Sequence, residues 1–175
     1  MHNFTDIAIL AAPRNCNSPS PPYDTINRRT EGVSNTTNIL KLCVGAESVG
    51  DLLQWHEAHL GLWAKGTTEH VTRMWPKRQD EVLDGGSLYW VIKGVILARQ
   101  RILALEPRRG ADGIERCALV MSAEVIRTEP APRRPFQGWR YLAPADSPRD
   151  LAKSRASDDT LPAALERALA DIGLR

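Results

Sequence analysis

The sequence has few cysteines and no long uncharged apolar run, and each absence excludes a class of protein. The three cysteines, Cys16, Cys43 and Cys117, are odd in number and widely separated. They therefore exclude a disulfide framework and a zinc ribbon built from Cys-x-x-Cys pairs. No apolar stretch approaches the roughly 20 residues that a membrane-spanning helix needs. The run from Ile7 to Ala12 is too short for a signal-peptide core. We expect a cytoplasmic protein with no membrane partner.

Motifs of several common enzyme classes are also missing. The chain has no Gly-x-Ser-x-Gly elbow, no Gly-x-x-x-x-Gly-Lys phosphate loop and no Gly-x-Gly-x-x-Gly dinucleotide loop. His56 and His59 stand three residues apart with Glu57 between them, but this is not the His-Glu-x-x-His pattern. No third metal ligand is fixed by the sequence, although His70 or Cys43 could lie near in space. The sequence therefore names no catalytic residue, no metal and no cofactor.

Positive and negative charges nearly balance over the whole chain, and the formal net charge is only +2. Between His70 and Tyr141, however, 13 Lys and Arg residues stand against 8 Asp and Glu residues. This local excess can form a patch for an anionic partner. The alternative is an ordinary solvated surface.

The length of 175 residues fits one domain. Residues 1–37 differ from the rest, because Asn15–Pro22 is rich in structure breakers and residues 28–37 are polar without periodicity. We expect residues 1–37 to be a disordered extension, or a mis-annotated one if the true start lies near Val33. We expect residues 38–175 to form a single α+β domain.

Periodicity predicts the elements of the first half of that domain. A strand is expected over Ile39–Val44, followed by a helix that Ser48 caps and that runs to about Leu60. Alternation predicts a strand over Glu69–Trp75. A loop or short helical turn is expected over Gln79–Gly86.

The run from Ser87 to Leu103 predicts one long strand, because it is rich in Val, Ile, Tyr and Trp. Gly94 in its middle is expected to form a bulge or a tight bend, which curls a sheet toward a barrel. Two faces follow from the alternation. One bears Leu88, Trp90, Ile92, Ile96, Ala98 and Ile102, and the other bears Tyr89, Val91, Lys93, Val95, Leu97, Arg99 and Arg101.

The rest of the chain predicts a hairpin, an irregular stretch and a helix. Arg108–Gly113 is expected to form the turn before strands at Glu115–Met121 and Val125–Thr128. The prolines from Pro130 to Pro135 predict an extended, unpaired path. An amphipathic C-terminal helix is expected from about Asp158 to Gly173.

Aromatic and basic residues interleave in three of these segments, and this combination suits a ligand with planar and anionic parts. We predict a ligand-binding face made by Arg73, Trp75, Lys77, Arg78, Tyr89, Arg99, Arg101, Arg134, Phe136, Trp139 and Arg140. The alternative is that the tryptophans are core residues and that the arginines pair with Glu106, Glu124 and Glu129. Trp90 is expected in the core on either interpretation.

The leading functional prediction is binding of RNA or a nucleotide-like small molecule through this face. Charge reversal at Arg99 and Arg101 is then expected to abolish binding and to leave the melting temperature nearly unchanged. A second hypothesis is a small hydrolase-like enzyme with Asp80, Glu81, Arg73 and Arg134 around a cleft. A third is a protein-interaction adaptor that presents the Pro130–Pro135 segment and the C-terminal helix.

Four segments resemble an uncharacterised family that is common in alphaproteobacteria, the domain of unknown function 1489. They are Thr72-Arg-Met-Trp-Pro-Lys-Arg78, Gly85-Gly-Ser-Leu-Tyr-Trp-Val-Ile-Lys-Gly94, Ala98-Arg-Gln-Arg101 and Arg134-Pro-Phe-Gln-Gly-Trp-Arg-Tyr-Leu142. The similarity runs from about Ile39 to Leu151 and brings no known activity. A looser similarity, at the level of the fold alone, is to small β-barrels of the pseudouridine-synthase-and-archaeosine-transglycosylase (PUA) type. It implies a curled, barrel-like mixed sheet with one helix near its start.

Overall fold

A curled, open sheet of seven strands forms the centre of the computed structural model, which describes residues 35–151 and 168–169. The strand order is β2-β5-β4-β3-β1-β7, and β6 pairs with β4 outside this path. Only β1 and β3 pair in parallel. The strands are β1 (Asn38–Leu42), β2 (Thr67–Thr72), β3 (Ser87–Ile92), β4 (Val95–Arg109), β5 (Glu115–Ser122), β6 (Ile126–Pro132) and β7 (Trp139–Leu142). The predicted α+β class with a mixed sheet is confirmed.

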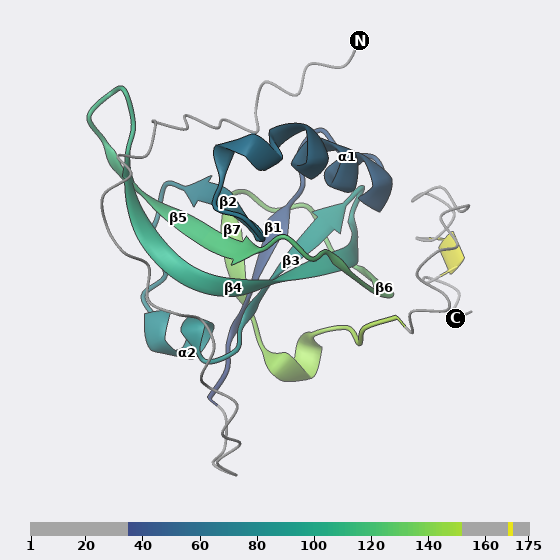
Figure 1. Cartoon of the computed structure of the whole chain (residues 1–175). Coiled ribbons are helices and arrows are strands. Elements are labelled where there is room, and N and C mark those ends of the chain that lie inside the picture. The colour runs from purple at the N-terminus through teal and green to yellow at the C-terminus, as the bar shows by residue number, and fades with distance from the viewer. Residues whose placement is uncertain (1–34, 152–167, 170–175) are drawn as a thin grey trace.

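Two short helices lie at opposite ends of the curled sheet, as Figure 1 shows. They are α1 (Val49–His59) and α2 (Gln79–Leu83), and 3-10 turns follow at Leu60–Leu62 and Pro144–Asp146. The predicted cap of α1 is present, because the Asp51 amide donates to Ser48 Oγ at 3.1 Å. The Ser48 amide in turn donates to Asp51 Oδ2 at 3.0 Å, which satisfies a second group at this helix end. The structure thus confirms the start of α1.

The single long strand predicted over Ser87–Leu103 is in fact a hairpin of β3 and β4. Lys93 and Gly94 form its two-residue turn, with φ values of 49° and 84°. Two consecutive positive φ angles match the twist of the paired strands, and glycine adopts this conformation at no steric cost. The predicted faces are wrong for the three residues after the turn, because Val95 and Leu97 join the main core and Ile96 faces the opposite side. A register shift between Ile96 and Ala98 then restores the predicted face, and Ala98 and Ile102 lie in the main core with Trp90.

Each face of the sheet carries its own apolar cluster. The inner, larger cluster includes Ile39, Leu88, Trp90, Ile92 and Leu119, and α1 adds Val49 and Leu52. The outer cluster contains Leu40, Tyr89, Val91, Ile96 and Leu142. Trp90 is only 4% exposed, so its predicted core position is confirmed. Cys43 and Cys117 are both buried free thiols.

A buried polar group, the Gln100 side chain, bridges three parts of the inner face. It is fully buried, accepts a hydrogen bond from Trp90 Nε1 at 2.8 Å, and donates to Thr68 Oγ1 and the Ser122 carbonyl. Both the oxygen and the nitrogen of the Gln100 amide therefore have hydrogen-bond partners, as a buried polar group requires. The bridge ties β3, β2 and β5 to β4.

The proline segment does not run unpaired, contrary to the sequence prediction. Strand β6 ends at Pro132 and pairs with the start of β4, with Val95 opposite Pro132 and Ile96 opposite Ala131. Among the strands of the sheet, β6 pairs with β4 alone and is therefore an edge strand. An edge strand tolerates proline, because the missing N–H costs no hydrogen bond to a second neighbour.

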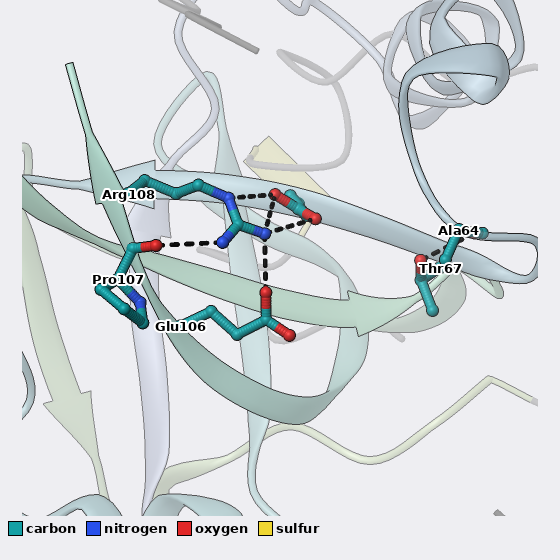
Figure 2. Close-up of polar contacts among 6 residues, drawn as sticks. Ala64, Thr67, Glu106, Pro107 and Arg108 are labelled. Atoms are coloured by element: carbon teal, nitrogen blue, oxygen red, sulfur yellow. Dashed lines mark hydrogen bonds and ion pairs between the residues drawn. The ribbon is translucent and has the colours of Figure 1, made fainter. Parts of the chain in front are cut away.

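Arg108 ties the far end of β4 to β2. Its guanidinium donates to both carboxylate oxygens of Glu69 at 3.0 to 3.1 Å and to Glu106 at 2.7 Å, and Figure 2 shows the hydrogen bonds that radiate from Arg108. The Glu69 carboxylate, one residue before His70 on β2, is thereby neutralised.

Several sequence predictions fall outside the described residues. They are the N-terminal extension up to residue 34 and almost all of the C-terminal helix. Within residues 35–151, neither helix is long and apolar enough to cross a membrane.

Candidate ligand-binding site

The two edge strands of the sheet, β2 and β7, face each other across a groove of about 740 Å³, which we call the seam groove. Its lining includes Lys41, Arg73, Met74, Trp139, Arg140 and Tyr141. The Trp139 indole N–H donates to the Met74 carbonyl at 3.2 Å, and this bond joins the two sides of the seam. The groove is therefore bounded by residues from both ends of the sheet.

Cross-strand register explains which side chains meet at the seam. Lys41 on β1 lies opposite Trp139 of β7 on one side and opposite Trp90 of β3 on the other. Paired residues share a face of the sheet, so the half-buried Lys41 stands between two tryptophans on the inner face. Burial lowers the pKa of its ammonium group. The sequence interpretation did not include Lys41, although alternation with Ile39 already placed it on the inner face.

The aromatic side of the groove is held in a fixed orientation. The rings of Trp139 and Tyr141 meet edge to face, with their centroids 5.0 Å apart. Both rings pack against the inner core cluster while also lining the groove. The Tyr141 hydroxyl accepts a hydrogen bond from the Arg78 amide at 3.0 Å. Trp139 thus offers a ring surface whose position is set before any ligand arrives.

The cationic side of the groove is not neutralised. Arg73 and Arg140 are both exposed, and no carboxylate among residues 35–151 pairs with either of them. The Arg140 guanidinium lies 5.8 Å from the centroid of the Phe136 ring. Of the predicted binding residues, Arg73, Trp139 and Arg140 line the seam groove, but the Arg140 guanidinium lies over Phe136 on the outer face, where Arg140 pairs with Leu40.

Three other predicted residues have structural partners. Tyr89 is buried in the outer cluster, and Trp75 packs against the inner cluster. Arg78 pairs with Glu81 and lies 5.3 Å from the Tyr141 ring centroid, so it supports the groove from outside. These side chains stabilise the fold around the seam.

Arg99 is paired too. It donates to both carboxylate oxygens of Asp150 at 2.6 Å and to Ser87 Oγ at 3.0 Å. Its side chain is 21% exposed, and Asp150 belongs to the segment that bridges to β6 through Thr128. Arg99 therefore links the segment around Asp150 to the sheet.

Charge reversal at Arg99 is consequently expected to lower stability, in contrast to the expectation from the sequence. Arg99→Glu removes a bidentate ion pair and places two carboxylates together, which we expect to cost about 1–2 kcal/mol of unfolding free energy. Thermal unfolding measures the effect. Arg101→Glu is the matched control, because Arg101 follows Arg99 by two residues on β4 and its side chain is exposed. Equal melting temperatures for both variants would show that the Arg99–Asp150 pair contributes nothing.

The remaining predicted residues, Lys77, Arg101 and Arg134, are exposed and lie outside the lining of the seam groove. The acidic cleft of the hydrolase hypothesis also lacks support. Glu81 accepts hydrogen bonds from Arg78 and Thr37, and its bond with Arg78 lowers the pKa of its carboxyl. A general acid needs a raised pKa instead.

A small cavity of about 40 Å³ lies beneath α1, and we call it the histidine cavity. Its lining includes Lys41, Cys43, Trp55, His56, His70 and Trp90. Lys41 lines both this cavity and the seam groove. His59 is not part of it: its Nδ1 bonds to the Trp55 carbonyl and its ring stacks on Trp55.

Burial controls the protonation of the cavity's titratable groups. It lowers the pKa of His56 to about 4 and that of His70 to about 3, and it raises the pKa of the Cys43 thiol to about 12. Both imidazoles and the thiol are therefore neutral near pH 7. Within the described residues, no group of three or more His, Cys, Asp or Glu side chains is arranged to hold a metal ion.

Comparison with known proteins gives a family but no function. Neither the curated proteins nor the solved structures contain a match to this chain. The family model described as "Protein of unknown function (DUF1489)" matches residues 39–175. This range covers the sheet, the seam groove and the histidine cavity, and the chain belongs to this family, the domain of unknown function 1489.

Proposed function

We propose that the seam groove binds a nucleotide-like ligand, either a free nucleotide or one nucleotide unit of RNA. The base lies against Trp139 and the phosphate lies beside Arg73. One observation carries the proposal: a fixed aromatic ring and an arginine without a carboxylate partner among residues 35–151 line the same groove of about 740 Å³.

The chemistry of the two contacts matches the two parts of a nucleotide. Stacking on an aromatic side chain contributes roughly 1–3 kcal/mol per base. A guanidinium donates two parallel hydrogen bonds to a phosphate, which point charges such as ammonium groups cannot do. The size of the groove lies in the range typical of small-ligand sites. Trp139 is already fixed by Met74 and Tyr141, so binding loses little side-chain entropy.

The proposal uses only part of the face predicted from the sequence. Arg73 and Trp139 contact the ligand, with Lys41 behind them, while Arg99 and Arg78 keep their carboxylate partners. The similarity to PUA-type barrels remains a sequence-based prediction and is not needed for it.

Charge reversal at Arg73 tests the proposal. Arg73→Glu removes a charge-assisted hydrogen bond and adds repulsion, so we expect at least about tenfold weaker binding. The measurement is fluorescence anisotropy of the full chain with a labelled single-stranded RNA, at low and moderate salt. Unlabelled nucleoside 5′-monophosphates are added as competitors. Competition indicates that a single nucleotide suffices, and its absence indicates that the RNA chain is required.

Arg101→Glu is the matched control, because it makes the same charge change at an exposed arginine outside the groove. We expect it to leave the affinity within about twofold and, like Arg73→Glu, to leave the melting temperature unchanged. Equal weakening by both variants would mean that only overall charge matters. Unchanged binding in Arg73→Glu would refute the groove as the site.

A further inference from the structure

Lys41 is a cation without a partner that lines the seam groove. Its side chain is half-buried, and among residues 35–151 it makes no hydrogen bond, no ion pair and no contact with the face of an aromatic ring. Burial lowers the pKa of its ammonium group, because the charged form loses hydration. Proteins normally compensate a charge that is withdrawn from water with a counter-charge. A bound anion would supply the one that Lys41 lacks.

No acidic side chain reduces the positive charge of the groove. Of the described residues that line it, three are lysine or arginine and none is aspartate or glutamate. Glu69 lines the neighbouring histidine cavity, but its carboxylate is already bound by Arg108. The Arg140 guanidinium lies over Phe136 on the outer face. Lys41 and Arg73 are therefore the two cations that remain for a ligand in the groove.

Trp139 is a neighbour of both cations. Lys41 lies opposite Trp139 in the β1–β7 register. The Trp139 indole donates to the carbonyl of Met74, the residue that follows Arg73 in the chain. Because both cations have long side chains, we expect the phosphate of a nucleotide that stacks on Trp139 to lie within reach of each.

The number of free phosphate oxygens decides which phosphates suit two cations. A guanidinium that binds a phosphate in the bidentate manner uses two of its oxygens. A phosphodiester inside an RNA chain has only two free oxygens and one negative charge, so Arg73 alone satisfies it. A phosphate monoester has three free oxygens and a charge of about −1.5 to −2 at pH 7. One oxygen and part of the charge then remain for an ammonium group.

We infer that Lys41 is the second phosphate-binding residue of the seam groove and makes the groove selective for a phosphate monoester over a diester. A monoester is present on a free nucleotide and at the phosphorylated end of an RNA, but not inside an RNA chain. This inference rests on the proposed function and names the anionic group that the groove takes. Trp139 stacks on the base in either case and does not contribute to this choice.

The test compares ligands that differ only at the phosphate. The probes are adenosine and uridine 5′-monophosphates and their methyl esters, in which a methyl group caps one oxygen and removes one charge. Isothermal titration calorimetry of the full chain at about pH 7.5, where the monoester is mainly a dianion, measures the affinities. We expect each monophosphate to bind about tenfold more tightly than its methyl ester, as one charge-assisted hydrogen bond implies. A short RNA with a 5′-phosphate, compared with the same RNA with a 5′-hydroxyl, shows whether an RNA end is also accepted.

Three variants assign the preference to Lys41. Lys41→Met keeps an unbranched side chain beside the tryptophans and removes the charge, so the preference for the monophosphate should fall to within about twofold. Its melting temperature should be unchanged or higher, because a half-buried charge without a partner is removed. Lys41→Arg keeps the charge and should retain most of the preference. Lys77→Met is the matched control, because Lys77 is exposed and outside the groove, and it should leave the preference unchanged.

The outcomes separate this inference from the proposed function. If the native protein binds monophosphates and methyl esters equally and Arg73→Glu weakens both, the groove binds nucleotides and the inference about Lys41 is wrong. A preference that survives Lys41→Met would also overturn it, because another group would then make the choice. If Lys41→Met removes the preference and Arg73→Glu changes nothing, the phosphate lies at Lys41 and the role proposed for Arg73 fails. If no nucleotide or RNA binds, both fail.

Discussion

Gln100→Leu is expected to lower the free energy of unfolding by about 3–5 kcal/mol, because it leaves several buried polar atoms without partners at about 1–3 kcal/mol each. In the folded protein, the fully buried Gln100 amide bonds to Trp90 Nε1, Thr68 Oγ1 and the Ser122 carbonyl. Leucine has a similar volume, so packing changes little and the loss reports on hydrogen bonding. Urea unfolding monitored by tryptophan fluorescence measures it.

Two further variants make this prediction specific. Arg101→Leu changes the neighbouring exposed residue of β4, and we expect an effect below about 0.5 kcal/mol. Trp90→Phe in the Gln100→Leu background removes the indole N–H that the leucine leaves unpaired. It should therefore cost less there than in the native background, which a double-mutant cycle detects. A loss below about 1 kcal/mol for Gln100→Leu would show that water replaces the missing amide.

Mild acid is expected to destabilise the protein because two imidazoles are buried in the neutral form. The pKa of His56 is about 4 and that of His70 about 3 in the folded chain, against about 6.5 for an unfolded histidine. As the pH falls below about 6.5, the unfolded chain binds protons that the folded chain does not, so stability is lost. Between pH 7 and pH 4.5 we expect a loss of about 2–3 kcal/mol for each imidazole.

The neighbouring charges act in the same direction or are already neutralised. Lys41 on β1 opposes protonation of His70, His59 opposes protonation of His56, and the Glu69 carboxylate on β2 is paired with Arg108. Urea unfolding at a series of pH values checks the prediction, with His56→Phe as the comparison. This variant should lose about half of the pH dependence. Curves of equal slope for both proteins would contradict the assignment of the acid sensitivity to His56.

Local chemistry explains which elements could be predicted from the sequence. The Ser48 cap, the turn after Arg109 and the burial of Trp90 depend on a few adjacent residues, and all were predicted. The β3–β4 hairpin was missed because the apolar run continues on both sides of Lys93 and Gly94, so periodicity alone showed no interruption. The Lys93-Gly94 pair was the available signal, because two-residue hairpin turns commonly have glycine at their second position.

The candidate site depends on pairings that no local pattern encodes. Arg99 and Asp150 are 51 positions apart, and their ion pair removes one of the predicted phosphate contacts. Arg73 has no carboxylate partner within the described chain. The residues that surround it come from β7, which is also distant from it in the sequence. The importance of Lys41 appears only when β1 is placed between β3 and β7. Sequence reasoning selected aromatic and basic residues, and the fold shows which of them line the same groove.

The pairing of β1 with β7 sets a condition on how the molecule assembles. Asn38 lies opposite Leu142, so the first strand of the sheet to leave the ribosome is completed by the last. Contacts between such distant parts of a chain are slow to form, because a long loop must close first. Until β7 is synthesised, one side of β1 remains an open edge on which a second nascent chain could pair. We therefore expect the seam groove, which β7 borders, to form in the final step of sheet assembly.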